Sequence, residues 1–313
     1  MPVTSCAARA ASSGGRARTC LLDHQRRRAG RLLAAPALLV ITAMTVVPLV
    51  MAFFLSFTRY DLLSPPRFVG FANYAEVLTD PLFGRVTVNT LVFAVGQVAV
   101  GVVVTFLVAM LFNQRLVANS LMRTTVYLPQ AMSYVTVALL WSFLYDPFNG
   151  PLNAVIQYLG GPQVNFLTET SLAMPSIMAM SLWRNFGYFM IILLAGLKAI
   201  PPELLEAAQI DGAGALRRLI HVTIPQMRNS LLFVTVTWFM GGLQMFTQAY
   251  VMTQGGPENA TRSVVYEIYR SAFSDLNIGR ACAISVLMFL FVAAFGLPLR
   301  VIEHLRARRA EGR

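Results

Sequence analysis

Six long apolar runs constrain this chain more than any other feature of its sequence. They cover about residues 32–57, 86–112, 124–145, 172–195, 229–253 and 281–299. A helix needs about 20 apolar residues to cross the hydrocarbon core of a bilayer, and each run reaches or nearly reaches that length. Only 12% of the residues are charged, against about 25% in a soluble domain. The sequence therefore predicts an all-α polytopic membrane protein with six transmembrane helices.

The positive charges indicate how these spans are oriented. An even number of spans places both termini on one side of the membrane. The two terminal segments and the alternate loops that share this side hold 18 Lys or Arg, whereas the opposite loops hold six. Because cytoplasmic loops carry the excess of Lys and Arg, both termini are predicted to be cytoplasmic. The net charge of +11 follows this pattern, so it does not indicate a nucleic-acid partner.

The ends of the chain differ in composition from the six runs. Residues 1–31 are rich in Ala, Ser, Gly and Arg, with Asp23 as their one acid, which predicts a disordered cytoplasmic tail. The first run is too long for a cleaved signal peptide, whose apolar region has about 7–15 residues. We expect a transmembrane domain over 32–303 and a basic cytoplasmic tail over 304–313, with membrane lipid around the spans.

The polar segment 196–225 separates the fourth run from the fifth. Pro201 and Pro202 favour a helix start, because the first turn needs no backbone donor. Asp211-Gly212-Ala213-Gly214 interrupts this helix, and a second short helix is predicted over Ala215–Val222. Pro225 is expected to mark its end. The pattern predicts a helix-turn-helix on the cytoplasmic surface.

The spacing inside this segment is specific. Glu206-Ala207-Ala208 is followed by three residues, Gly212, nine more residues and then Val222-Thr223-Ile224-Pro225. This resembles the EAA loop of ABC importer permeases, with Val and Ile in place of Ile and Leu. In that family the loop docks into a cleft of a separate ATPase subunit. The alternative is an ordinary loop with a chance match. The resemblance assigns ATPase coupling to Glu206, Ala207, Ala208, Asp211, Gly212 and Pro225.

Other segments are similar to the sugar-permease group of the same superfamily. They are Gly70, Asn73 and Tyr74, then Asp80, Pro81 and Phe83, then the stretch from Val251 to Pro257. The resemblance implies an ABC type I importer permease fold, a second related permease, an ATPase dimer and an extracytoplasmic solute-binding protein. The chain contains no phosphate-binding loop. We therefore expect no enzyme activity and no cofactor in this chain, with ATP and Mg²⁺ bound by the partner ATPase.

Polar residues within the spans are the candidates for a solute pathway. Arg184 is the one charge well inside a run, and such residues usually face a protein interior or a water-filled path. Its alternative role is to pair with a carbonyl or a neighbouring subunit and order the packing. Gln244 and Gln248 share a helix face, and their alternative role is interhelical hydrogen bonding. The candidates are Trp183, Arg184, Asn185, Tyr188, Trp238, Gly241, Gly242, Gln244, Met245 and Gln248.

In maltose-type permeases the substrate is held by the two spans that flank the EAA loop. The ungapped match, anchored at the EAA motif, brings Trp183 and Tyr188 onto an aromatic pair of that site. Aromatic rings stack on the C–H faces of sugars. It fails at Gly241, Gly242 and Met245, where the maltose-type permease has larger or amide side chains. We therefore expect a sugar or sugar-like solute different from maltose, and Arg184 leaves an anionic solute open.

The sequence as a whole predicts a permease subunit of an ABC importer in the bacterial inner membrane. An ion-driven secondary transporter of a small polar solute is the alternative. That alternative predicts carboxylates inside the spans, and the six runs contain none. Cys6, Cys20 and Cys282 form no spacing pattern, so we predict neither a metal site nor a disulfide framework.

Overall fold

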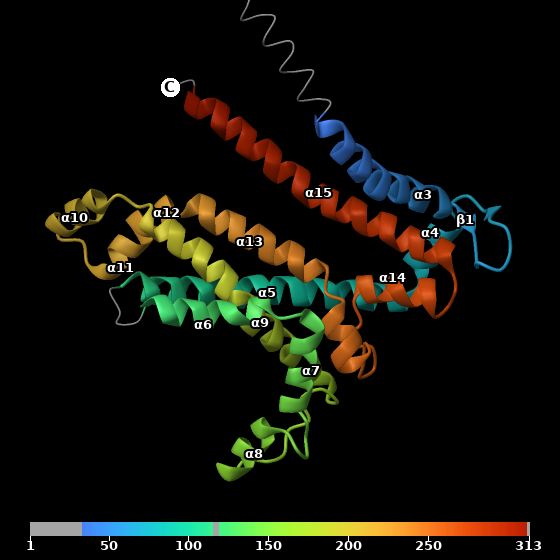
Figure 1. Ribbon diagram of the computed structural model, residues 1–313, viewed down its shortest axis with the longest axis horizontal. Coiled ribbons are helices and arrows are strands. Elements are labelled where there is room, and N and C mark those ends of the chain that lie inside the picture. Colours follow the sequence, from blue (N-terminus) through green and yellow to red (C-terminus); the bar gives the residue numbers. More distant parts are fainter. Residues whose placement is uncertain (1–32, 115–118, 312–313) are drawn as a thin grey trace, which may run out of the picture. The chain divides into compact units, whose positions relative to one another are not determined.

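The computed structural model describes residues 33–114 and 119–311, which are mostly helical (Figure 1). The disordered tail predicted for 1–31 lies outside the described residues and stays a prediction. The chain divides into two units, Met1–Leu55 and Ser56–Arg313.

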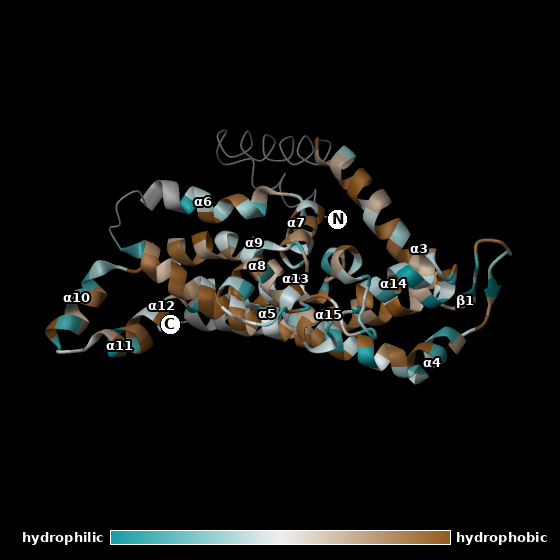
Figure 2. Cartoon of the chain, turned by 90° about the horizontal axis from the view of Figure 1, so that it is seen from below, coloured by the Kyte–Doolittle hydropathy of each residue, from teal (hydrophilic) through white to brown (hydrophobic). Residues whose placement is uncertain are grey.

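The described part of the first unit is one helix, Leu33–Leu55, which is long and apolar enough to cross a membrane. It includes a π-helical turn, η2 (Thr42–Val46), and then α3 (Val47–Leu55). Apolar residues run along α3, whereas hydrophilic residues are concentrated in segments such as α10 (Pro202–Ile210) (Figure 2). A helix that is apolar on all sides is typical of a membrane span, as predicted for the first run.

The second unit begins with a short antiparallel hairpin, β1 (Thr58–Arg59) and β2 (Arg67–Phe68), followed by α4 (Ala72–Thr79). The Asn73 side-chain amide donates hydrogen bonds to the backbone carbonyls of Ser56 and Thr58, each at 2.8 Å. The segment with Gly70, Asn73 and Tyr74 therefore fastens the hairpin to α4.

Three long helices form the centre of the second unit: α5 (Pro81–Asn113), α9 (Thr170–Lys198) and α13 (Arg228–Leu243). The first two are long and apolar enough to cross a membrane, as predicted for the second and fourth runs. Small residues let the helices approach closely. A methyl group added to Gly242 on α13 would lie 2.6 Å from the Ala94 Cα atom on α5.

The third predicted span is divided into two helices. α6 (Asn119–Ala131) is followed by α7 (Tyr134–Leu144), and Met132 and Ser133 lie between them. Pro129 lacks a backbone N–H for the helical ladder, which weakens the last turn of α6. The run 124–145 is thus not one continuous helix.

The fifth predicted span is also interrupted. α13 ends at Leu243, and the π-helical turn η4 (Ala249–Thr253) follows after a non-helical stretch around Met245. The Met245 carbonyl accepts a hydrogen bond from the Ser263 hydroxyl instead of an intrahelical partner. Interrupted helices in membrane proteins are stable where the freed backbone groups are re-satisfied in this way.

Three further helices are α8 (Pro151–Tyr158), α14 (Val264–Phe273) and α15 (Ile278–Glu311). α8 begins at a proline that follows Gly150 and ends before the turn at Gly160. α15 continues well beyond the predicted end of the sixth span at residue 299. The boundary expected between a membrane domain and a tail at residues 303 and 304 falls inside this helix.

Candidate functional site: a polar cavity and a surface loop

A polar cavity of about 470 Å³ lies among α5, α6, α7, α9 and the interrupted α13. Seven of the ten residues predicted for the solute pathway line it: Asn185, Tyr188, Trp238, Gly241, Gly242, Gln244 and Gln248. The lining residues are aromatic, amide, hydroxyl or glycine residues, and none of them carries a charge. Ligand sites commonly combine apolar walls with a few placed polar groups.

Arg184 does not line the cavity but lies directly behind it. Its Nη1 donates to Gln130 Oε1 at 3.1 Å and to Asn185 Oδ1 at 3.0 Å. Its Nη2 donates to the backbone carbonyls of Gln130 at 3.4 Å and Met132 at 3.0 Å. The guanidinium also lies 4.1 Å from the centre of the Tyr134 ring, a cation–π contact. The carbonyls freed where α6 ends thus accept hydrogen bonds from this charge.

Trp183 and Met245 are the other two predicted residues outside the cavity lining. The Trp183 ring packs edge-on against Trp141, with 5.7 Å between the ring centres. Met245 is fully buried in the same apolar cluster. Both side chains therefore contribute to core packing in this structure.

Tyr134 joins several polar side chains of the cavity. Its hydroxyl accepts hydrogen bonds from Asn185 Nδ2 at 3.2 Å and from Gln248 Nε2 at 3.0 Å. Gln248 Nε2 also donates to Ser181 Oγ at 3.1 Å. This network connects α7, α9 and the stretch after α13, and it fixes which amide atoms remain for a ligand.

Sequence reasoning missed eight residues of the lining: Phe93, Gln97, Gln130, Tyr134, Ser181, Phe189, Thr237 and Thr247. Gln97 and Gln130 carried a usable signal, since each is a long amide inside an uncharged apolar run. The aromatic and hydroxyl residues carried none, because such residues are common throughout the spans.

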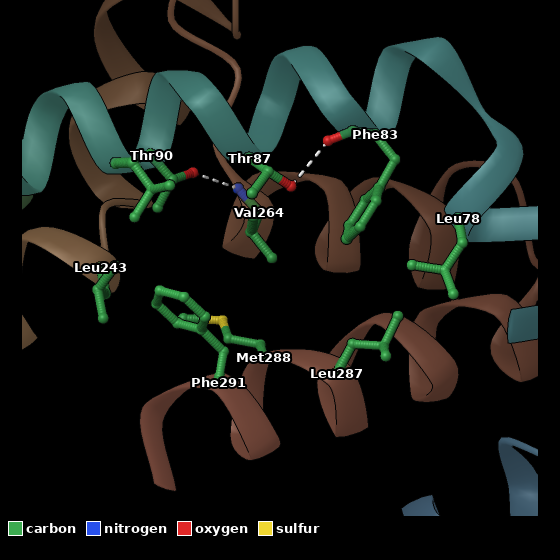
Figure 3. A pocket seen from close by; sticks show the side chains of 10 residues that line it. Leu78, Phe83, Thr87, Thr90, Leu243, Val264, Leu287, Met288 and Phe291 are labelled. Carbon is green, nitrogen blue, oxygen red and sulfur yellow. Dashed lines mark hydrogen bonds between the residues drawn. The ribbon is translucent and has the colours of Figure 1, made fainter. Parts of the chain in front are cut away.

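A second, smaller cavity of about 170 Å³ lies between α5, α14 and α15 and is lined almost entirely by apolar side chains. In Figure 3, Phe83 on α5 and Leu287, Met288 and Phe291 on α15 point toward this space. The Thr87 hydroxyl donates to the Phe83 carbonyl, and the Thr90 hydroxyl accepts from the Val264 amide. The cavity is thus less suited to a polar solute than the larger one.

Ion pairs join α4, α14 and the starts of α5 and α15. Arg262 and Glu267 form a buried pair at 2.6 Å, and Arg280 contacts Glu76 at 2.9 Å and Asp80 at 2.5 Å. Burial by itself raises the pKa of the Asp80 carboxyl. Hydrogen bonds from Arg280 and the Leu82 amide outweigh burial, and the pKa lies below its ordinary value. The predicted Asp80-Pro81 segment is therefore an anchor between helices.

The predicted coupling segment forms two short helices on the surface. α10 ends at Ile210, and α11 (Ala215–Arg218) follows after a turn in which Gly212 has a φ of +74°. This conformation favours glycine. The Ala213 amide donates to the Ala208 carbonyl at 2.9 Å, which closes the end of α10. Glu206, Ala207 and Asp211 are exposed, and Ala208 is half-buried.

Pro225 does not end the second helix of this segment, contrary to the prediction. Helical turns continue from α11 through the π-helical turn η3 (Leu219–Thr223) into α12 (Ile224–Gln226). The Ile224 amide donates to the Leu219 carbonyl, a wider hydrogen bond than an α-helix makes. The extra residue in the turn makes room for the proline ring. η2 precedes Pro48 in the same way.

Comparison with known proteins places this geometry in a family. Residues 98–311 match the family model described as "Binding-protein-dependent transport system inner membrane component". The probable ABC transporter permease protein YurN of Bacillus subtilis is 32% identical, over 85% of this chain and 92% of its own length. The trehalose/maltose transport system permease protein MalF of Thermococcus litoralis is 31% identical, over 92% of this chain and 98% of its own length.

Further similarities support the same family and fold. The sulfoquinovosyl glycerol transport system permease protein SmoG of Agrobacterium fabrum is 30% identical, over 90% of this chain and 92% of its own length. A chain of a bacterial alginate ABC transporter, solved with an alginate-bound periplasmic protein, superposes with a TM-score of 0.76. It is 23% identical, covers 92% of this chain and is itself covered to 96%. The chain is therefore a membrane-embedded permease of the binding-protein-dependent transport system inner membrane component family.

Proposed function

We propose that this permease forms, together with a second related permease, the membrane pathway for a sugar or sugar-like solute. The observation that carries the proposal is the uncharged cavity of about 470 Å³ beside the interrupted α13. The Tyr188 ring, which is 37% exposed, offers a face for the C–H surface of a sugar ring. The amides of the cavity both donate and accept hydrogen bonds, as hydroxyl groups require.

The family and the exposed surface of α10 and α11 support the proposed partners. An extracytoplasmic binding protein delivers the solute, and an ATPase dimer on the cytoplasmic side binds ATP and Mg²⁺. The apolar side chains of Ile210 and Leu216 are 87% and 69% exposed beside the Glu206 stretch. Exposed apolar residues next to small alanines suit contact with another protein. Leu205 packs on the core cluster and connects this surface to the membrane helices.

The proposed mechanism couples these two regions. ATP closes the ATPase dimer, the docked α10 and α11 move with it, and α9 and α13 change their inclination because the segment joins them. The cavity then opens alternately to each side of the membrane. We propose six crossings with both termini in the cytoplasm, supported by the excess of Lys and Arg on that side.

Affinity purification of the tagged chain from its native membrane in mild detergent tests this proposal. Mass spectrometry should identify a P-loop ATPase, a second six-span permease and a binding protein. Cysteine labelling from the outside would test orientation at Asn149 and Gly214, with only the first accessible in intact cells. Recovery of the chain alone, with uptake driven by an ion gradient, would contradict the proposal.

A further inference from the structure

Arg184 presents no accessible hydrogen-bond donor to a solute. A guanidinium has five N–H groups, and the four on Nη1 and Nη2 are directed at oxygens of Gln130, Met132 and Asn185. The fifth, on Nε, has no partner among the described residues, but it is buried and out of a solute's reach. The charge is therefore held by protein oxygens, and it cannot form the paired hydrogen bonds that carboxylates and phosphates take from arginine.

The same bonds orient two amides of the cavity. Gln130 Oε1 and Asn185 Oδ1 both accept from Arg184, so neither side chain can flip without placing its NH₂ group against the guanidinium. Gln130 lines the cavity, and its remaining polar group is the NH₂ group. Asn185 uses one N–H on the Tyr134 hydroxyl and keeps the other. Arg184 thereby leaves N–H groups of Gln130 and Asn185 as the donors available to a solute.

Two other amides are oriented in the opposite sense. Both N–H groups of Gln248 are used on Tyr134 and Ser181, which leaves its Oε1 as the free group. Gln97 Nε2 donates to the Met178 carbonyl at 2.9 Å, and its Oε1 is buried without a partner among the described residues, so a solute does not reach it in this structure. The polar groups left for a solute are therefore donors at Gln130 and Asn185 and an acceptor at Gln248.

This arrangement distinguishes between solutes of different charge. A hydroxyl both donates and accepts, so one sugar can bond to the donors at Gln130 and Asn185 and to the acceptor at Gln248. A carboxylate, phosphate or sulfonate only accepts, and its charge would lie against the Gln248 oxygen. No charged side chain lines the cavity to offset the loss of hydration of an anion.

We propose that the cavity selects an uncharged solute rich in hydroxyl groups, and that Arg184 is a positioning residue that orients Gln130 and Asn185. This inference rests on the proposed function, since it narrows the solute class of the same pathway. It answers the question that the sequence left open, because the one charge in the spans is assigned to the protein and not to an anionic ligand.

The first experiment measures which solutes the intact transporter accumulates. The purified complex, with its binding protein, is placed in ATP-loaded proteoliposomes. These receive an equimolar mixture of neutral di- and trisaccharides, hexitols, uronic acids, sugar phosphates and sugar sulfonates. Mass spectrometry of the lumen should detect neutral compounds only. Accumulation of an acidic sugar would overturn this inference and leave the proposed function standing, whereas accumulation of nothing in the mixture would contradict the proposed function itself.

The second experiment tests positioning with the neutral solute that accumulates most. Arg184→Lys keeps the charge but loses the fork of hydrogen bonds, so KM should rise about tenfold with kcat changed less than about threefold. Gln130→Ala should raise KM by a similar factor, and the double variant should be no worse than the more affected single variant.

Gln244→Ala is the matched control, because Gln244 lines the cavity without a hydrogen bond to Arg184 or its partners. In the double variant, the rise in KM from Gln244→Ala should multiply with the rise from Arg184→Lys. Multiplying effects of Arg184→Lys and Gln130→Ala would show that Arg184 acts independently of Gln130 and would overturn the positioning role. If Arg184→Lys does not assemble with its partners, Gln130→Ala still tests the proposal. An unchanged KM in Gln130→Ala would contradict the role of the Gln130 side chain as a donor to the solute.

Discussion

The coupling loop and the solute cavity differ in how the chain builds them. The loop is contiguous, its candidate residues lie between Glu206 and Pro225, and most of them are exposed. The cavity gathers side chains from Phe93 to Gln248 on five helical segments, and two of its amides are oriented by the half-buried Arg184. The loop thus depends on local backbone geometry, whereas the cavity depends on how distant helices pack.

The largest expected effect concerns the loop. Gly212→Ala places a side chain at a φ of +74°, which costs about 1–2 kcal/mol for a non-glycine residue. The turn between α10 and α11 should shift, so that ATP-driven uptake in proteoliposomes falls about tenfold or more. ATP hydrolysis should continue and membrane insertion should be unchanged. Glu206→Ala should act in the same direction by weakening the contact with the ATPase.

Gly214→Ala is the control for this comparison. Gly214 lies in the same exposed turn with a φ of −63°, and an added methyl would meet nothing within 4 Å. Uptake should stay within about twofold of the unaltered protein, since a conformation open to every residue carries no strain. Equal losses in both variants would show that any side chain in this turn disturbs transport, and that the backbone geometry of Gly212 is not the cause.

The next effect concerns helix packing at the cavity. Gly242→Ala would bring a methyl within 2.6 Å of the Ala94 Cα atom, a backbone atom of α5. The helices must separate, which should lower the free energy of unfolding by about 1–3 kcal/mol. The neighbouring Gly241→Ala meets nothing within 4 Å and should leave the unfolding temperature in detergent unchanged. A loss of stability in Gly241→Ala but not in Gly242→Ala would show that Gly241, and not Gly242, packs against α5.

A smaller effect is expected at the centre of the polar network. Tyr134→Phe keeps the ring over Arg184 but removes the hydroxyl that accepts from Asn185 and Gln248. Two donors lose a partner, and the cost should be about 1 kcal/mol because both side chains border a cavity that water can enter. The apparent affinity for the solute should fall several-fold in uptake assays. Unchanged affinity would show that this network orders packing alone.

The loop was predictable from sequence because its determinants are local. Gly212, the two prolines at its start and the Glu206 stretch each act within a few residues. The one error, at Pro225, arose because a π-helical turn admits a proline that an α-helix does not. Seven of the ten residues predicted for the solute pathway line the cavity. Gln97 and Gln130 were missed although each is an amide inside an apolar run, because only the packing of α5 and α6 against α9 brings them to the same cavity.

The ion pair between Asp80 and Arg280 gives the smallest predicted effect. A carboxyl whose pKa is lowered in the folded state contributes stability above its ordinary pKa of 3.8, and that contribution is lost as the pH falls. Asp80→Asn should therefore lower the unfolding temperature at pH 7 by an amount worth about 1 kcal/mol or less. The difference from the unaltered protein should shrink below about pH 4.

Asp275→Asn is the control for this prediction. The pair between Asp275 and Arg270 is exposed and longer, at 3.8 Å, so this variant should show a smaller difference at pH 7. The absence of any difference between Asp80→Asn and the unaltered protein across pH 3 to 7 would mean that Asp80 acts only by capping α5 through the Leu82 amide, since an asparagine oxygen makes that bond as well.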